Sequence, residues 1–333
     1  MFYRKNKMGL VSQILDFFSF YSLSEVFKNE YQSIEDLMRF LEGKGMGREL
    51  RTVLAIVKKF EQEGFILRIG QKGSDPVYGA TYVAQTISTH YQEYGAYDFY
   101  YYGFAAIRRH FLQSVLPIDV TANDGSKDIG TCFAIDSHRL LTARHCIEGK
   151  RRIVILDPMG QLIIPSTIWI PTDGSDLALI EMNYYNYSSI PHFKIENGHV
   201  LDEVLTMGYP PIPGFDAVNV SDMSHIGAAI KVSEGRIVAE ERTLFEEDSF
   251  FLINAKVKGG NSGGPIINNL GYTIGMIVMI PMDSGNQDKL DHLGYGVGVT
   301  GKKLKGFLSD VNRNSDKVSK LPLITSKLGF STL

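Results

Sequence analysis

Apolar residues recur with helical spacing through much of the first sixty residues of the chain. Residues 9–28 carry such a stripe, which predicts one or two helices. In the next segment Ser33 precedes two acidic residues, a pattern typical of a helix N-cap, and Gly43 marks the end. A third stripe runs from Leu50 to Phe60 and stops at Gly64. These patterns predict a small helical region.

Short apolar runs replace the helical stripes after this region. Residues 65–69 and the phrase "VYGATYVA" predict two strands, and the turn "GQKGSDP" separates them. Beyond residue 112 short strands follow at close spacing, which is typical of an all-β sandwich or barrel. They are expected at 115–120, 130–135, 153–156, 177–182 and 204–207.

Length and composition indicate an ordinary globular protein with two domains. The chain has 333 residues, of which 44% are hydrophobic and 21% are charged. The longest apolar run, 272–282, is too short to span a membrane, and the early residues lack a secretory cleavage pattern. We therefore expect a cytoplasmic protein without a membrane partner. Its two cysteines, Cys132 and Cys146, are expected to be free thiols.

An aromatic segment separates the helical region from the region of strands. It begins "HYQEYGAYDFYYY" at His90, and tyrosines of this kind suit an interface because the ring is buried while the hydroxyl stays wet. We expect it to pack between two domains or to act as a regulatory hinge. The predicted divisions are a recognition domain at 1–90, a linker with a short helix at 91–112, a second domain at 113–312 and a tail at 313–333.

Three phrases in the region of strands carry side chains suited to nucleophilic catalysis. They are "LLTARHC" ending near His145, "GSDLALIEM" containing Asp176, and "GGNSGGP" surrounding Ser262. Each alone is typical of a surface loop or turn. Together they supply a hydroxyl, an imidazole that can take its proton, and a carboxylate that fixes the imidazole tautomer. We therefore predict a catalytic triad.

The glycines around Ser262 have a separate expected function. A tight glycine loop can aim backbone N–H groups at the oxygen that becomes negative as an amide is attacked. We expect this oxyanion hole at Gly260, Asn261 and Ser262, with the N–H groups of Gly260 and Ser262 as the donors.

The phrases around these residues resemble the trypsin-like (chymotrypsin-fold) serine proteases over residues 113–312. The similarity is greatest to the bacterial high-temperature-requirement and glutamyl-endopeptidase branches, and includes "VLTMGYP", "LGYTIGMIVM" and "GYGVGVTGKKLKGFLSDV". It implies a double β-barrel, and thus a multidomain protein of α plus all-β class. Asn261 replaces the aspartate of zymogen-activated relatives, so activation by a new N-terminus is not expected. Arg144 replaces a small residue and is expected to touch substrate or the first domain.

The same resemblance places the substrate pocket near a lysine. Lys256 would lie at the base of the pocket, with Val257, Val278, Met279 and Ile280 around it. A lysine pointing inward would favour an acidic substrate side chain, whereas one pointing to solvent would leave an apolar pocket.

The first ninety residues resemble a winged-helix domain, on their order of elements and the phrase "FEQEGFI". If it bound DNA, five basic residues would face phosphate: Arg48, Arg51, Lys58, Lys59 and Lys72. The region has 12 Lys plus Arg against 10 Asp plus Glu, a surplus of 2, and the whole chain has a net charge of −3. We therefore favour recognition of a protein partner, or dimerisation, over DNA.

These observations predict a serine endopeptidase controlled by its winged-helix domain and acting on a specific protein or on itself, in bacterial stress response or antiphage defence. No cofactor or metal is expected. The alternatives are a DNA-binding transcriptional regulator with a protease-fold sensing or self-cleaving module, and an inactive pseudoprotease scaffold.

Overall fold

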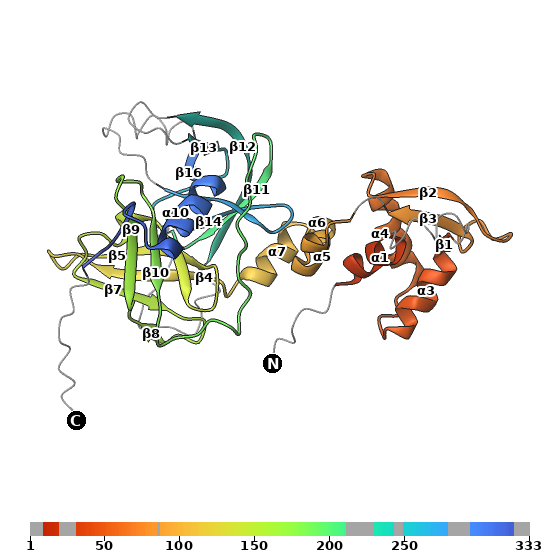
Figure 1. Ribbon diagram of the computed structural model, residues 1–333, viewed down its shortest axis with the longest axis horizontal. Helices are drawn as coiled ribbons and strands as arrows, with labels where there is room; N and C mark the ends of the chain where they lie inside the picture. Colours follow the sequence, from red (N-terminus) through yellow and green to blue (C-terminus); the bar gives the residue numbers. More distant parts are fainter. Residues whose placement is uncertain are drawn as a thin grey trace, which may run out of the picture. The chain divides into compact units, whose positions relative to one another are not determined.

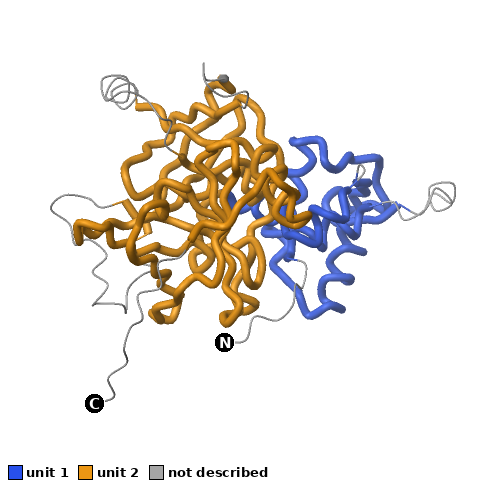
Figure 2. The backbone as a smooth tube through the Cα atoms, turned by 60° about the vertical axis from the view of Figure 1, so that its left-hand side comes forward, with its two compact units in different colours: residues 1–103 blue, residues 104–333 orange. Residues whose placement is uncertain are grey.

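The chain folds into two compact units, residues 1–103 and residues 104–333 (Figure 2). The computed structural model describes residues 9–19, 31–84, 87–210, 230–242, 249–278 and 294–322 (Figure 1). The division between the units falls just after the aromatic segment, between Gly103 and Phe104. No helix within these described ranges is both long and apolar enough to cross a membrane.

The first unit packs helices against a three-stranded antiparallel sheet with strand order β1-β3-β2. Its first elements are α1 (Leu10–Phe18), β1 (Gln32–Ser33), α3 (Ile34–Gly43), α4 (Leu50–Gln62), β2 (Ile66–Gln71) and β3 (Ala80–Ala84). The expected helix start is confirmed, because Ser33 and Asp36 form a reciprocal capping box at α3. The apolar stripe of α4 is buried at Val53, Val57 and Phe60.

The aromatic segment forms two short helices that belong to this first unit. They are α5 (Thr89–Tyr94) and α6 (Ala96–Tyr102). The ring of Tyr97 lies in the core of the unit, and the rings of Tyr100 and Tyr101 lie 6.1 and 6.3 Å from the ring of Phe60. The ammonium of Lys59 on α4 donates to the carbonyls of Tyr100 and Tyr101, both at 3.2 Å. Lys59 therefore stabilises the C-terminal end of α6.

The second unit begins with a helix and an eight-stranded antiparallel sheet. The helix α7 (Phe104–Phe111) is anchored by Phe111, whose ring stacks on Phe193 at 4.1 Å. The sheet has the strand order β17-β9-β10-β6-β5-β4-β7-β8. Its strands are β4 (Val115–Thr121), β5 (Lys127–Ala134), β6 (Arg139–Thr142), β7 (Arg152–Leu156), β8 (Leu162–Ile163), β9 (Thr167–Pro171), β10 (Ala178–Glu181) and β17 (Val318–Lys320).

The remaining strands of this unit close into a barrel, in the order β11-β12-β13-β16-β15-β14. They are β11 (Glu203–Gly208), β12 (Lys231–Arg242), β13 (Ser249–Ile253), β14 (Pro265–Asn268), β15 (Thr273–Ile277) and β16 (Gly296–Thr300). The five strands expected from the sequence are all present, so the expectation of β-barrel-like sheets is confirmed.

The chain after the barrel returns to the first sheet. Helix α10 (Gly301–Arg313) is capped by the hydroxyl of Thr300 and buries Leu304, Phe307 and Val311. Strand β17 then pairs with β9, so part of the region expected as a tail is an edge strand. Helix α10 (Figure 1), which contacts β15 and β16 of the barrel, thus leads the chain back to the eight-stranded sheet at β17.

Substitutions at Lys59 and at its neighbour Lys58 test whether Lys59 stabilises the end of α6. We expect Lys59→Met to lower the free energy of unfolding of this unit by about 1 kcal/mol, because two helix-terminal carbonyls lose a charged donor. Lys58 is exposed on the same helix, so Lys58→Met is the matched control and should change stability by less than about 0.5 kcal/mol. Urea denaturation followed by helical circular dichroism measures both. Equal effects would contradict the capping role.

Candidate active site

Two paired strands bring His145 and Asp176 together. His145 lies in the short 3-10 turn Arg144–Cys146 after β6, and Asp176 lies just before β10. Because β6 pairs with β10, with Ala178 opposite Thr142, the two segments run side by side. The Nδ1 atom of His145 lies 2.7 Å from Oδ2 of Asp176, and the backbone N–H of His145 donates to Oδ1 at 2.9 Å. The carboxylate thus fixes both the ring and the backbone of His145.

The surroundings of His145 favour its protonated form. Burial disfavours the charged ring, but hydrogen bonds and charges of Asp176 and Cys146 outweigh it and raise the pKa of His145 to about 10. The Asp176 carboxylate is the group that an imidazole needs in order to stabilise the positive form it takes after accepting a proton.

The loop of Ser262 is shaped by a tight turn between β13 and β14. The N–H of Asn261 donates to the carbonyl of Lys258 at 3.0 Å, and Gly260 has φ +89°, which is typical of a type II turn. This bond engages the N–H of Asn261. Within the part of the chain that the structure describes, the N–H groups of Gly260 and Ser262 have no acceptor. They remain the donors suited to an oxyanion.

Thr131 on β5 attaches this loop to the first sheet. Its N–H donates to the carbonyl of Ser262 at 3.1 Å, and its hydroxyl donates to the carbonyl of Gly260 at 2.6 Å. The same hydroxyl accepts the N–H of Tyr209 at 3.1 Å. The side chain is fully buried, so each bond is shielded from water. Thr131 therefore sets where Ser262 lies relative to His145.

The glycine after Ser262 allows this close approach. Gly263 has φ +82°, and a Cβ atom there would lie 2.2 Å from the carbonyl oxygen of Thr131 and 2.4 Å from the hydroxyl of Thr142. Both the backbone conformation and the space exclude a side chain. The expected glycine-rich loop is thus required by packing against the first sheet as well as by the turn.

Cys146 lies between His145 and Ser262. Its sulfur is 3.7 Å from Nε2 of His145 and 3.6 Å from the carbonyl oxygen of Ser262. Among the described residues no hydrogen bond joins the Ser262 hydroxyl to His145, a bond that unliganded enzymes often form only on binding substrate. The expectation of free thiols is confirmed, because Cys132 and Cys146 are unbridged.

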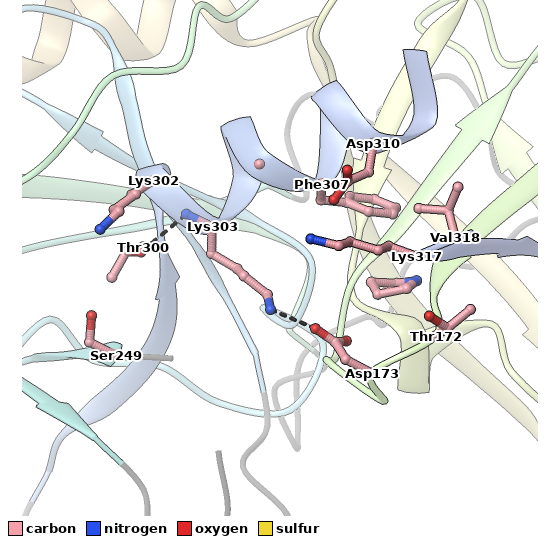
Figure 3. Close-up of a pocket in the computed structure, with 12 residues that line it drawn as sticks. Thr172, Asp173, Ser249, Thr300, Lys302, Lys303, Phe307, Asp310, Lys317 and Val318 are labelled. Carbon is pink, nitrogen blue, oxygen red and sulfur yellow. Dashed lines mark hydrogen bonds and ion pairs between the residues drawn. The ribbon is translucent and has the colours of Figure 1, made fainter. Parts of the chain in front are cut away.

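The loop carrying Asp176 is supported by α10 and β17. Lys303 on α10 forms an ion pair with Asp173 at 2.7 Å, and the carboxylate of Asp173 also accepts the N–H of Ser175 at 2.9 Å (Figure 3). Burial opposes ionisation of Asp173, but these partners outweigh it and lower its pKa. The N–H of Thr172 donates to the carbonyl of Lys317 at 2.8 Å. These contacts fix the loop three residues before Asp176.

A cavity of about 500 Å³ lies beside these supports (Figure 3). Thr172 and Asp173 line it from one side, and Lys302, Lys303 and Phe307 line it from α10. His145, Asp176 and Ser262 do not line it. The cavity is therefore not the place where substrate would meet Ser262.

The residues expected around the substrate pocket are only partly described. Lys256 is exposed, and its N–H donates to the hydroxyl of Ser233 at 2.8 Å. Val257 is half-buried against Gly296, where a Cβ atom would lie 2.5 Å from the valine side chain, and Val278 is buried. Met279 and Ile280 lie outside the described residues. The preference for an acidic side chain stays a prediction.

The basic residues outside the triad have different surroundings. Arg144 forms an ion pair with Glu148 at 2.6 Å. In the first unit Lys72 pairs with Asp36 at 3.3 Å, and Lys59 is engaged by α6 as described above. Lys59 is therefore not placed to face phosphate as expected, because the end of a helix already occupies its ammonium. Arg48, Arg51 and Lys58 are exposed.

Sequence reasoning did not identify Thr131, Gly130 or the active-site position of the Cys146 thiol. A Cβ atom at Gly130 would lie 3.1 Å from the sulfur of Cys146. The only signal in the sequence was the phrase "GTCFAI", in which glycine and threonine stand two residues and one residue before Cys132.

The space at Gly263 can be tested by adding a single methyl group. We expect Gly263→Ala to lower the free energy of unfolding by at least about 2 kcal/mol, because it combines a strained backbone with a clash against Thr131. Gly259→Ala is the matched control, since nothing lies within 4 Å of its Cβ position. Urea denaturation followed by the fluorescence of Trp169 measures both. A stable Gly263→Ala protein would contradict the close approach.

The region that holds His145, Asp176 and Ser262 is similar to known proteins. The family profile of the trypsin-like peptidase domain matches residues 130–276. The serine endoprotease DegS of Haemophilus influenzae is 31% identical over 138 residues, which cover 41% of this chain and 37% of that protein. The chloroplastic protease Do-like 2 of Arabidopsis thaliana is 24% identical over 192 residues, or 56% of this chain and 28% of that protein.

The likeness to solved structures is weaker. The HtrA-type protease AlgW with tripeptide is 21% identical, with a TM-score of 0.47 over 64% of this chain and 65% of that one. The chain spans between 21% and 37% of the length of the curated relatives it matches. The family match rests on the sequence of the region that holds His145, Asp176 and Ser262. Residues 130–276 are therefore similar to the trypsin-like peptidase domain, the domain type of serine endopeptidases.

Proposed function

We propose that this chain is an active serine endopeptidase with Ser262 as nucleophile, His145 as general base and Asp176 as the group that orients His145. The observation that carries the proposal is the pair of hydrogen bonds from His145 to Asp176, beside a Ser262 loop that Thr131 attaches to the same sheet. The substrate is a protein or peptide, and the reaction needs no cofactor.

The proposed reaction follows from the positions of these groups. The Ser262 hydroxyl attacks the carbonyl carbon of the peptide bond while Nε2 of His145 takes its proton. The N–H groups of Gly260 and Ser262 donate to the resulting oxyanion. The imidazolium then gives its proton to the leaving amine, and the C–N bond breaks to leave an acyl-enzyme. Water attacks this ester with His145 again as the base, which restores the Ser262 hydroxyl.

The first unit supplies the proposed control. Its order of α1, β1, α3, α4, β2 and β3 supports a winged-helix domain. Arg51, Ala55 and Lys58 share the exposed face of α4, a helix that such domains use for recognition. We propose that this face binds a regulatory protein partner, and that cleavage of a specific protein in stress response or antiphage defence follows. Recognition of DNA through the same face is the alternative.

A fluorophosphonate probe tests the nucleophile. We expect wild type to be labelled and Ser262→Ala not to be labelled, because the probe bonds to an activated serine. Asp176→Asn should reduce the labelling rate by a factor on the order of 10⁴, since the imidazole would lose the partner that fixes its tautomer. Equal labelling of wild type and Ser262→Ala would overturn the assignment, as would absence of labelling with and without added peptide.

A variant that removes two basic residues of the α4 face and Arg48, just before α4, tests the proposed control. We expect the Arg48, Arg51 and Lys58 triple alanine variant to keep fluorophosphonate labelling but to lose the new protein N-termini that wild type, and not Ser262→Ala, generates in cells. The same set of N-termini from the variant would contradict control through this face. Retardation of duplex DNA by wild type at physiological salt, lost in the variant, would identify DNA as the partner. Acidic residues before the cleavage sites would support Lys256 in the pocket.

A further inference from the structure

A thiol lies next to Nε2 of His145 in this structure. In a serine protease this ring nitrogen takes the proton of the nucleophilic serine. The Nδ1 atom of His145 is engaged by Asp176, so Nε2 is the nitrogen available to take the Ser262 proton. The sulfur of Cys146 lies 3.7 Å from Nε2. The same sulfur lies 3.6 Å from the carbonyl oxygen of Ser262. Cys146 is only 8% exposed, so water competes little for these contacts.

The packing around Cys146 explains why its thiol is held there. Gly130 on β5 leaves no side chain against the sulfur, since even a Cβ atom would lie 3.1 Å from it. The other cysteine, Cys132, is fully buried and donates its own S–H to the carbonyl of Leu116 at 3.5 Å. No disulfide forms between Cys132 and Cys146, so the sulfur of Cys146 stays within reach of Nε2 of His145.

The thiol of Cys146 has two possible hydrogen-bond partners, the carbonyl oxygen of Ser262 and Nε2 of His145. When the S–H donates to the Ser262 carbonyl, Nε2 is left for the Ser262 hydroxyl. When the sulfur instead accepts the Nε2–H of the protonated ring, that nitrogen is occupied and the protonated ring, which cannot act as a base, is stabilised. We propose that Cys146 is a positioning residue that competes with Ser262 for Nε2 of His145 and holds the triad in a resting state at neutral pH. This inference rests on the proposed function of Ser262.

The electrostatics of the pair agree with this competition. Burial lowers the pKa of His145, but Asp176 and Cys146 together raise it to about 10. A base must be neutral to accept a proton, so raising its pKa reduces the active fraction at any pH below that value. Among the described residues, Cys132 on β5 is a buried thiol that interacts electrostatically with Cys146, and Arg144, which adjoins His145, pairs with Glu148. Of the two residues that raise the pKa of His145, Cys146 is therefore the one that can be replaced without removing a member of the triad.

The test is the pH dependence of fluorophosphonate labelling in Cys146→Ala. Loss of the thiol lowers the pKa of the base, so we expect the acidic limb of the labelling rate to move to lower pH by at least one unit. This corresponds to a rate at neutral pH that is about tenfold higher than wild type or more. Cys146→Ser keeps a hydrogen-bonding group that does not ionise and should also move the limb. Cys132→Ala removes a thiol without touching His145 and should leave the limb in place.

A second measurement separates this inference from the proposed function. The imidazole of His145 can be titrated by NMR in Ser262→Ala with and without Cys146→Ala, which requires no activity. We expect titration at lower pH when Cys146 is replaced. The same titration in both proteins, or an unmoved acidic limb in a folded Cys146→Ala protein, would overturn the competition. If wild type is not labelled at any pH, the proposed function fails while the titration still decides whether Cys146 acts on His145.

Discussion

The active site depends on one buried threonine that belongs to neither the triad nor the serine loop. Thr131 is part of the first sheet, yet both its N–H and its hydroxyl donate to carbonyls of the loop from the second barrel. Its own carbonyl accepts the hydroxyl of Thr142, on the strand that leads to His145. The hydrogen bonds that locate Ser262 and those that locate His145 therefore pass through the same residue. Because unsatisfied buried polar groups are costly, neither half of the site can move without breaking this network.

The close contact between the two sheets explains the composition of the serine loop. Thr131 can reach the carbonyls of Gly260 and Ser262 because Gly263 has no side chain to meet the first sheet. Gly264 is required within the barrel itself, since a Cβ atom there would lie 2.4 Å from the carbonyl oxygen of Met207. The glycines thus serve two requirements at once. One is the turn that leaves two N–H groups without acceptors, and the other is the packing that fixes this turn in space. Either requirement alone would tolerate a less glycine-rich phrase.

Much of the fold and the three catalytic candidates could be predicted because their signals are local. The cap at Ser33 and the expected strands depend on neighbours in the chain, and each phrase around His145, Asp176 and Ser262 is a short local motif that gains its meaning from the other two. The contacts of Thr131 join residues 129 positions apart, and those of Lys59 join residues 41 and 42 positions apart. Contacts between residues so far apart leave no periodic pattern in the sequence, so they could not be predicted from it. The winged-helix resemblance would have Lys59 face phosphate if the domain bound DNA, and only the packing of α6 shows that its ammonium is already engaged.

The return of the chain to the first sheet has a consequence for the order in which the enzyme is assembled. The loop before Asp176 receives Lys303 from α10 and the carbonyl of Lys317 just before β17, and β17 itself pairs with β9. His145, Asp176 and Ser262 all precede these supports along the chain. A growing polypeptide that has passed Ser262 therefore holds every catalytic side chain but not the segment that steadies its carboxylate. The last of these supports, β17 (Val318–Lys320), lies more than fifty residues beyond Ser262, so the catalytic side chains are synthesised before the segment that completes their support.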